Sequence, residues 1–104
     1  MAKKKKATQL FHEYFSEWIG LYKEGAVRTI TLDKYYMSSQ WLKRLAPQLK
    51  LYELDRRSYQ QLLNDYALKH EKQTTMDFHH QLKAALLDAV DEGLIPTNPT
   101  RKII

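Results

Sequence analysis

The sequence predicts an all-α fold, a compact and orthogonal four-helix bundle. Apolar residues recur at spacings of three and four in four separate segments, and no run alternates apolar and polar residues over the length of a strand. The three glycines and three prolines, Gly20 apart, fall near the expected helix boundaries. Because loops of roughly three to nine residues join the segments, neighbouring helices must pack against one another.

The first predicted helix lies between Thr8 and Gly25. Thr8 can cap its N-terminus, and Gly25 stands where a left-handed residue would close the helix. Its apolar face is mostly aromatic and consists of Leu10, Phe11, Tyr14, Phe15, Trp18 and Tyr22. We expect Trp18 to be shielded from solvent, because it lies within this stripe.

The second predicted helix begins at Thr31. Asp33 lies in its first turn, where the helix dipole favours an acid, and the helix must end before Pro47. We expect Trp41 to be shielded as well, beside Met37. The inner face consists of Leu32, Tyr35, Tyr36, Ser39, Leu42 and Leu45.

Two further helices complete the bundle. Asp55 is expected to cap the third, at 56–70, and Thr74 or Thr75 the fourth, which ends at Gly93. The third helix buries Tyr59, Leu62, Leu63 and Tyr66, and the fourth buries Phe78, Leu82, Ala85, Leu86 and Ala89.

The chain is divided into three parts. Residues 1–7 form a basic tail or an interdomain linker, residues 8–95 form the helical domain, and residues 96–104 begin a linker to a further domain. Pro96 and Pro99 hold the chain extended after the last helix, and Ile103 and Ile104 have nothing local to pack on. The chain therefore resembles one module of a longer protein.

The net charge of +5 is unevenly distributed. The run from Lys3 to Lys6 supplies much of it, and the stretch from Ala26 to Leu87 carries ten basic against six acidic residues. A surface that faces a polyanion would show such an asymmetry, because neutralising phosphates releases counterions. A solvated surface is the alternative that charge alone leaves open.

The sequence lacks the residue patterns that most catalytic mechanisms require. Without cysteine there are no disulfides or thiolate metal sites, and the sequence contains no glycine-rich phosphate loop or zincin helix. His79 and His80 are adjacent and so point in different directions on a helix, which disfavours metal binding. Asp88, Asp91 and Glu92 are expected on a solvated face. We expect no catalytic site, metal, cofactor, signal peptide or membrane span, and a cytoplasmic location.

Several short sequence motifs, in the order in which they occur, resemble those of one protein family. They are Phe11-x-x-Tyr14-x-x-x-Trp18, the run from Val27 to Thr31 followed by Tyr35, Tyr59-Gln60-x-Leu62-Leu63-Asn64, Thr75-x-x-x-His79, and Ala89-Val90-x-x-Gly93-Leu94-Ile95-x-x-Asn98-Pro99. This order is similar to the N-terminal, SAM-like core-binding domain of tyrosine recombinases of the phage-integrase type.

The resemblance implies a DNA-binding module that closes one half of a clamp around the core recombination site, in integration or excision. Its partners would be double-stranded DNA, sister protomers on the site, and the catalytic domain of the same parent chain, which this sequence does not include. The setting would be a prokaryotic cell or a phage-infected host. The alternative function is a helical protein-interaction domain that docks a partner helix through an apolar groove.

In that family the second and fourth helices face DNA. The candidate DNA-binding residues are therefore Thr29, Thr31, Lys34, Ser38, Lys72, Thr74, Thr75, His79 and Lys83. Helix N-termini present N–H groups to phosphate, and hydroxyl groups add hydrogen bonds. Thr31 and Thr75 have the alternative role of helix caps, and His79 that of a partly packed side chain. Lys34 and Lys83 have no such structural role and are the leading candidates.

Overall fold

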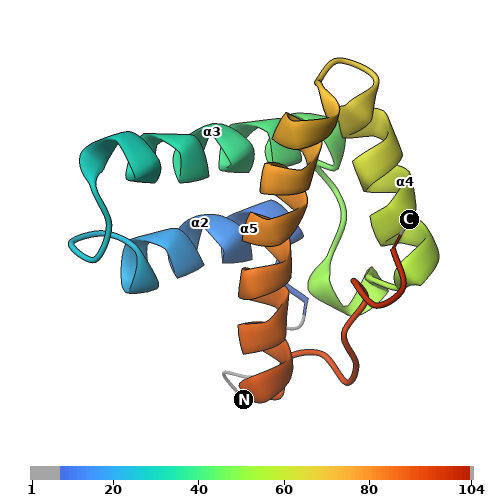
Figure 1. The fold of residues 1–104 in the computed structure, drawn as a ribbon. Helices are drawn as coiled ribbons and strands as arrows, with labels where there is room; N and C mark the ends of the chain where they lie inside the picture. Colours follow the sequence, from blue (N-terminus) through green and yellow to red (C-terminus); the bar gives the residue numbers. More distant parts are fainter. Residues whose placement is uncertain (1–7, 104) are drawn as a thin grey trace.

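The computed structural model describes residues 8–103 and confirms the all-α prediction. Its helices are α2 (Phe11–Tyr22), α3 (Thr29–Leu45), a 3-10 turn η1 (Leu51–Glu53), α4 (Arg56–Ala67) and α5 (Lys72–Asp91). No strand forms within the described range, where Leu10 and Lys50 make an isolated β-bridge. In Figure 1, α2 and α3 form one hairpin, and α5 crosses both at a steep angle with α4 beside it.

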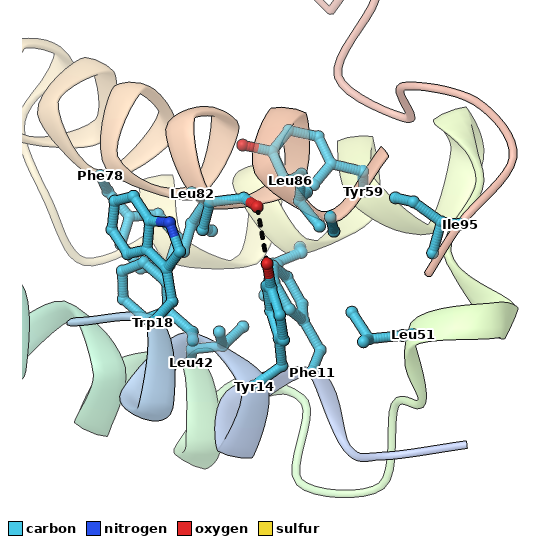
Figure 2. Close-up of a cluster of buried hydrophobic side chains, with 14 of the residues drawn as sticks. Phe11, Tyr14, Trp18, Leu42, Leu51, Tyr59, Phe78, Leu82, Leu86 and Ile95 are labelled. Atoms are coloured by element: carbon cyan, nitrogen blue, oxygen red, sulfur yellow. Dashed lines mark hydrogen bonds between the residues drawn. The ribbon is translucent and has the colours of Figure 1, made fainter. Parts of the chain in front are cut away.

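A single core joins these helices. Its fully buried large side chains come from every element: Phe11, Phe15 and Ile19 from α2, Leu42 from α3, Leu51 from η1, Tyr59 from α4, and Phe78, Leu82 and Leu86 from α5. Figure 2 shows the α5 side chains packed between those of α2 and α4. The three-and-four spacing of apolar residues therefore predicted most of these side chains, but Tyr22 is 46% exposed and α3 buries Ser38 rather than the predicted Ser39.

Two hydrogen bonds fasten α2 to α5. The Tyr14 hydroxyl donates to the backbone carbonyl of Ala85 at 3.3 Å, a bond drawn in Figure 2. One turn further along α2, Trp18 Nε1 donates to Asp88 Oδ2 at 2.7 Å. Asp88 is therefore half-buried and bonded, and its placement on a solvated face was wrong because the indole nitrogen needs an acceptor.

The predicted helix boundaries are partly corrected. Asp55 caps α4 by accepting from the Ser58 backbone N–H at 2.8 Å, as expected, but α4 ends at Ala67 rather than at 70. Gly25 (φ 80°) and Gly93 (φ 76°) adopt the left-handed conformation predicted for helix ends.

The predicted threonine caps were wrong. The cap position of α2 is Leu10 rather than Thr8, and the Phe11 N–H donates to the Leu49 carbonyl at 2.7 Å. A tertiary hydrogen bond thus satisfies the start of α2, where the sequence pattern predicted a local side-chain cap. The other two helices begin earlier than predicted, at Thr29 instead of Thr31 and at Lys72 instead of Thr74 or Thr75.

The two tryptophans differ in burial. Trp18 is shielded, with 3% of its surface exposed, as predicted. Trp41 is only half-buried, and its ring packs edge-on against His70 at 4.6 Å and Tyr66 at 5.9 Å. Tyr66 of α4 and His70 just after that helix thus pack against this ring, while the expected neighbour Met37 is 60% exposed.

The segment after α5 turns back toward α4 (Figure 1). Leu94, Ile95 and Thr100 are buried, Ile103 packs against the core, and Arg56 Nη2 donates to the Lys102 carbonyl at 3.3 Å. The expectation that Ile103 has nothing to pack on was therefore wrong. The division at residues 96–104 stays a prediction, and Lys3 to Lys6 and Ile104 lie outside the described residues.

Candidate nucleic-acid interface

A groove of about 300 Å³ lies between α3 and α5 and brings three predicted residues together. Lys34 and Ser38 contribute from α3 and Thr74 from α5. Ser38 is only 7% exposed, because it shares the inner side of α3 with Leu42. The remaining lining residues are Met37, Trp41, Tyr66, His70, Asp77, Phe78 and Gln81.

Stacked aromatic rings form the base of this groove. Tyr66 stacks on Phe78 at 3.9 Å and on His70 at 3.8 Å between ring centroids. His70 Nδ1 lies 2.8 Å from the Tyr66 carbonyl, which accepts its hydrogen bond. Burial, followed by the charge of Asp77, raises the pKa of Tyr66. The base is therefore aromatic, while Lys34, Thr74 and Asp77 supply further polar groups around it.

The other predicted residues of α5 lie on its opposite flank. Lys72, Thr75, His79 and Lys83 follow one another at spacings of three and four, so they share one stripe of the helix. At 3.6 residues per turn this stripe is about 160° from that of Thr74 and Gln81. The structure therefore divides the α5 candidates between two flanks, which the sequence treated as one face.

His79 is held on this second flank by α4. The Tyr59 hydroxyl lies 2.9 Å from His79 Nδ1 and 3.3 Å from the His79 carbonyl. Burial, then the neighbouring His80 and Lys83, lowers the pKa of His79, so its neutral form is favoured. Burial also raises the pKa of Tyr59, which keeps its hydroxyl protonated. The expected partial packing of His79 is confirmed.

Solved structures show what this arrangement resembles. The chain superposes on the N-terminal domain of prophage pi2 protein 01, an integrase from Lactococcus lactis, with a TM-score of 0.88 and 32% identity over 91% of this chain and 90% of that one. It also matches residues 59–159 of a phage integrase from Staphylococcus saprophyticus, with a TM-score of 0.82 and 29% identity over 92% and 87%. This chain belongs to the phage integrase family, as an N-terminal domain. No protein-family model and no curated protein matches it.

The integrase domain presents two helix N-termini without side-chain caps. Neither Arg28 before α3 nor Glu71 before α5 makes a capping hydrogen bond through its side chain. Thr29 and Lys72, the first residues of these helices, are exposed, whereas Thr31 is half-buried. Thr75 Oγ1 donates back to the Glu71 carbonyl at 2.9 Å instead of capping. Both ends therefore offer N–H groups to an anion.

Sequence reasoning missed several exposed residues of the integrase domain. Arg28 stands at the uncapped start of α3, and its position directly before a helix was an available signal. Gln73, Met76 and His80 lie on the outermost side of α5 and are exposed. Only the packing of α5 on the core showed which side this is.

The described part of the integrase domain shows no metal centre. Within residues 8–103, no group of three or more histidine, aspartate or glutamate side chains lies close enough to hold an ion. No helix in that range is both long and apolar enough to traverse a bilayer.

Proposed function

We propose that this domain is the DNA-binding module of a site-specific tyrosine recombinase and grips the core recombination site as one half of a clamp. The observation that carries the proposal is the pair of uncapped N-termini, of α3 and α5, with Lys34 and Thr74 flanking the groove between these helices. Phosphates favour such N–H groups and nearby cations. Integration or excision would need the catalytic domain of the parent chain and sister protomers, in a prokaryotic or phage-infected cell.

The two flanks of α5 suit a helix that lies in the major groove. A helix with its side chains is about 10–12 Å across, and the major groove is about 12 Å wide. Lys34 and Thr74 would then approach one phosphate backbone, and Lys72 and Lys83 the other. Between them the exposed Gln73, Met76 and His80 would face the base edges. This orientation accounts for candidates on both sides of one helix.

Charge reversal tests the proposal. The chain should bind duplex DNA with a dissociation constant in the non-specific range of about 10⁻⁴ to 10⁻⁶ M, and binding should weaken steeply with salt. Lys34→Glu and Lys83→Glu should each weaken it in a fluorescence anisotropy titration, and the double variant should abolish it. Both side chains are exposed, so melting should stay nearly unchanged.

Lys43→Glu is the matched control. Lys43 is also an exposed lysine of α3, but it borders a surface hollow beside α2, together with His12 and Glu13. Lys23 and Lys50 are poorer controls, because their amino groups lie 5.1 Å from the Trp18 ring and 5.9 Å from the Tyr52 ring. Equal loss of affinity in Lys43→Glu and Lys34→Glu would place the DNA-binding face elsewhere.

The alternative, a domain that docks a partner helix, is favoured by one observation. The groove between α3 and α5 contains Trp41 and Phe78, and the neighbouring Met37 is 60% exposed. Apolar docking is insensitive to salt, whereas phosphate binding is not. The same titration at low and high salt therefore distinguishes the two functions.

A further inference from the structure

A second concave site lies beside the C-terminal half of α2, at Glu92 just after the end of α5. This cleft of about 180 Å³ is lined by Tyr14, Glu17, Trp18, Leu21, Tyr22 and Glu92. Tyr14 and Trp18 are buried, but Leu21 is 72% and Tyr22 46% exposed. An exposed leucine beside an aromatic cleft is a feature that nothing in the proposed DNA contact uses.

The cleft is also electronegative. Glu17 and Glu92 line it, and Asp88 accepts the hydrogen bond of the Trp18 indole at its edge. The pKa of Tyr14 is raised by burial first and then by the charges of Glu92 and Asp88. The same aromatic cluster already attracts one cation, since Lys23 Nζ lies 5.1 Å from the centre of the Trp18 ring. Carboxylates and ring faces together suit a planar guanidinium group.

A matching cation lies on the outer face of α4. There Arg56, Arg57, Gln60, Gln61 and Asn64 surround a shallow hollow of about 550 Å³. Arg56 donates to the Lys102 carbonyl, whereas the Arg57 side chain is exposed and attracts the carboxylate of Asp55. Figure 1 shows α4 at one side of the molecule and the end of α2 at the other. One copy therefore cannot bring its own Arg57 into its own cleft.

We propose that the cleft receives Arg57 from a second copy of this chain, in a head-to-tail contact between the α4 face of one copy and the α2–α5 cleft of the next. Each copy carries one cleft and one arginine face, so the contact is heterologous rather than symmetric about a two-fold axis. Leu21 and Tyr22 would cover the aliphatic part of the arginine, and Glu17 and Glu92 would accept from its guanidinium. The contact is independent of DNA and does not rest on the proposed function.

The test uses two variants that each disable one side. Glu17→Arg reverses a charge in the cleft, and Arg57→Glu reverses a charge on the α4 face. By sedimentation velocity at low salt, the unmodified chain should associate as its concentration rises, and high salt should weaken that association. Each single variant should associate about tenfold more weakly or worse. A mixture of the two should regain one native interface, because Arg57→Glu keeps an intact cleft and Glu17→Arg keeps Arg57.

Two charge reversals outside the proposed contact serve as controls. Asp33→Arg and Lys69→Glu reverse exposed charges outside both surfaces and should leave association unchanged. The proposal is wrong if the unmodified chain stays monomeric at every concentration tested, or if the mixture fails to associate. Loss of association in Glu17→Arg but not in Arg57→Glu would indicate a two-fold contact between clefts and would also overturn it.

Discussion

The indole nitrogen of Trp18 donates a 2.7 Å hydrogen bond to Asp88 and ties α2 to α5 across 70 positions of sequence. The Trp18 ring also stacks on Phe15 at 5.7 Å and lies below the Lys23 amino group. One side chain thus contributes apolar burial, a ring contact and the partner of a half-buried carboxylate. Together with Tyr14, it therefore joins α2 to α5.

Truncating this side chain should destabilise the domain severely. Trp18→Ala removes a side chain that is 3% exposed, and we expect it to cost about 3 to 5 kcal/mol of unfolding free energy, much of what a domain of this size has. Urea denaturation followed by circular dichroism measures the change. An alanine variant as stable as the parent chain would show that α2 is misplaced.

Trp18→Phe separates the hydrogen bond from the packing. Phenylalanine keeps most of the apolar contact but leaves the half-buried Asp88 without its donor, at a cost of about 1 to 3 kcal/mol. Combining it with Asp88→Asn should recover part of the loss, because an amide is cheaper to leave unpaired than a carboxylate. Strictly additive losses in the two variants would contradict a direct interaction.

Asn98 should stabilise the segment that follows α5. Its Oδ1 accepts from the backbone N–H of Thr100 at 2.8 Å and from the buried Thr100 hydroxyl at 2.5 Å. Asn98→Ala leaves both donors unpaired and should cost about 1 to 3 kcal/mol in urea denaturation. Thr97→Ala, one residue earlier and exposed, is the control and should be nearly neutral.

His79 should make stability fall as the solution is acidified. Its pKa lies below the ordinary 6.5 because of burial, His80 and Lys83, so the unfolded chain takes up a proton at a higher pH than the folded one. Stability is therefore present above 6.5 and is lost as pH falls toward the folded pKa. The urea midpoint should drop between about pH 7.5 and about pH 5.5.

The His79→Gln variant isolates this effect. Glutamine does not titrate, so the drop in urea midpoint should shrink, whereas His12→Gln on α2 should retain it. An equal drop in His79→Gln and the parent chain would assign the pH dependence to other groups.

The chain should not cleave or join DNA. A strand-transfer reaction needs preorganised positive charge around the phosphate that reacts, and the basic residues here are dispersed over α3, α4 and α5. Incubation with nicked duplex DNA, with and without divalent metal, followed by denaturing electrophoresis, checks for a covalent adduct. Capture of DNA on any tyrosine would contradict the prediction.

Local sequence determined the helices and some of their ends. The signals were the apolar periodicity, the Asp55 cap, the two left-handed glycines and Pro47. Each acts within a few residues, so it can be recognised from the sequence alone. The predicted Thr8 cap failed because a distant carbonyl, that of Leu49, satisfies the start of α2.

The arrangement of the candidate site depended on tertiary packing. Periodicity places Lys34 on α3 and Thr74 and Lys83 on α5, but it does not set the rotation of one helix about another. Burial of Phe78, Leu82 and Leu86 fixes that rotation, and it brings Thr74 to Lys34 while turning Lys83 to the α4 side. The sequence by itself thus determined which residues belong to each helix, and long-range burial decided which of them meet.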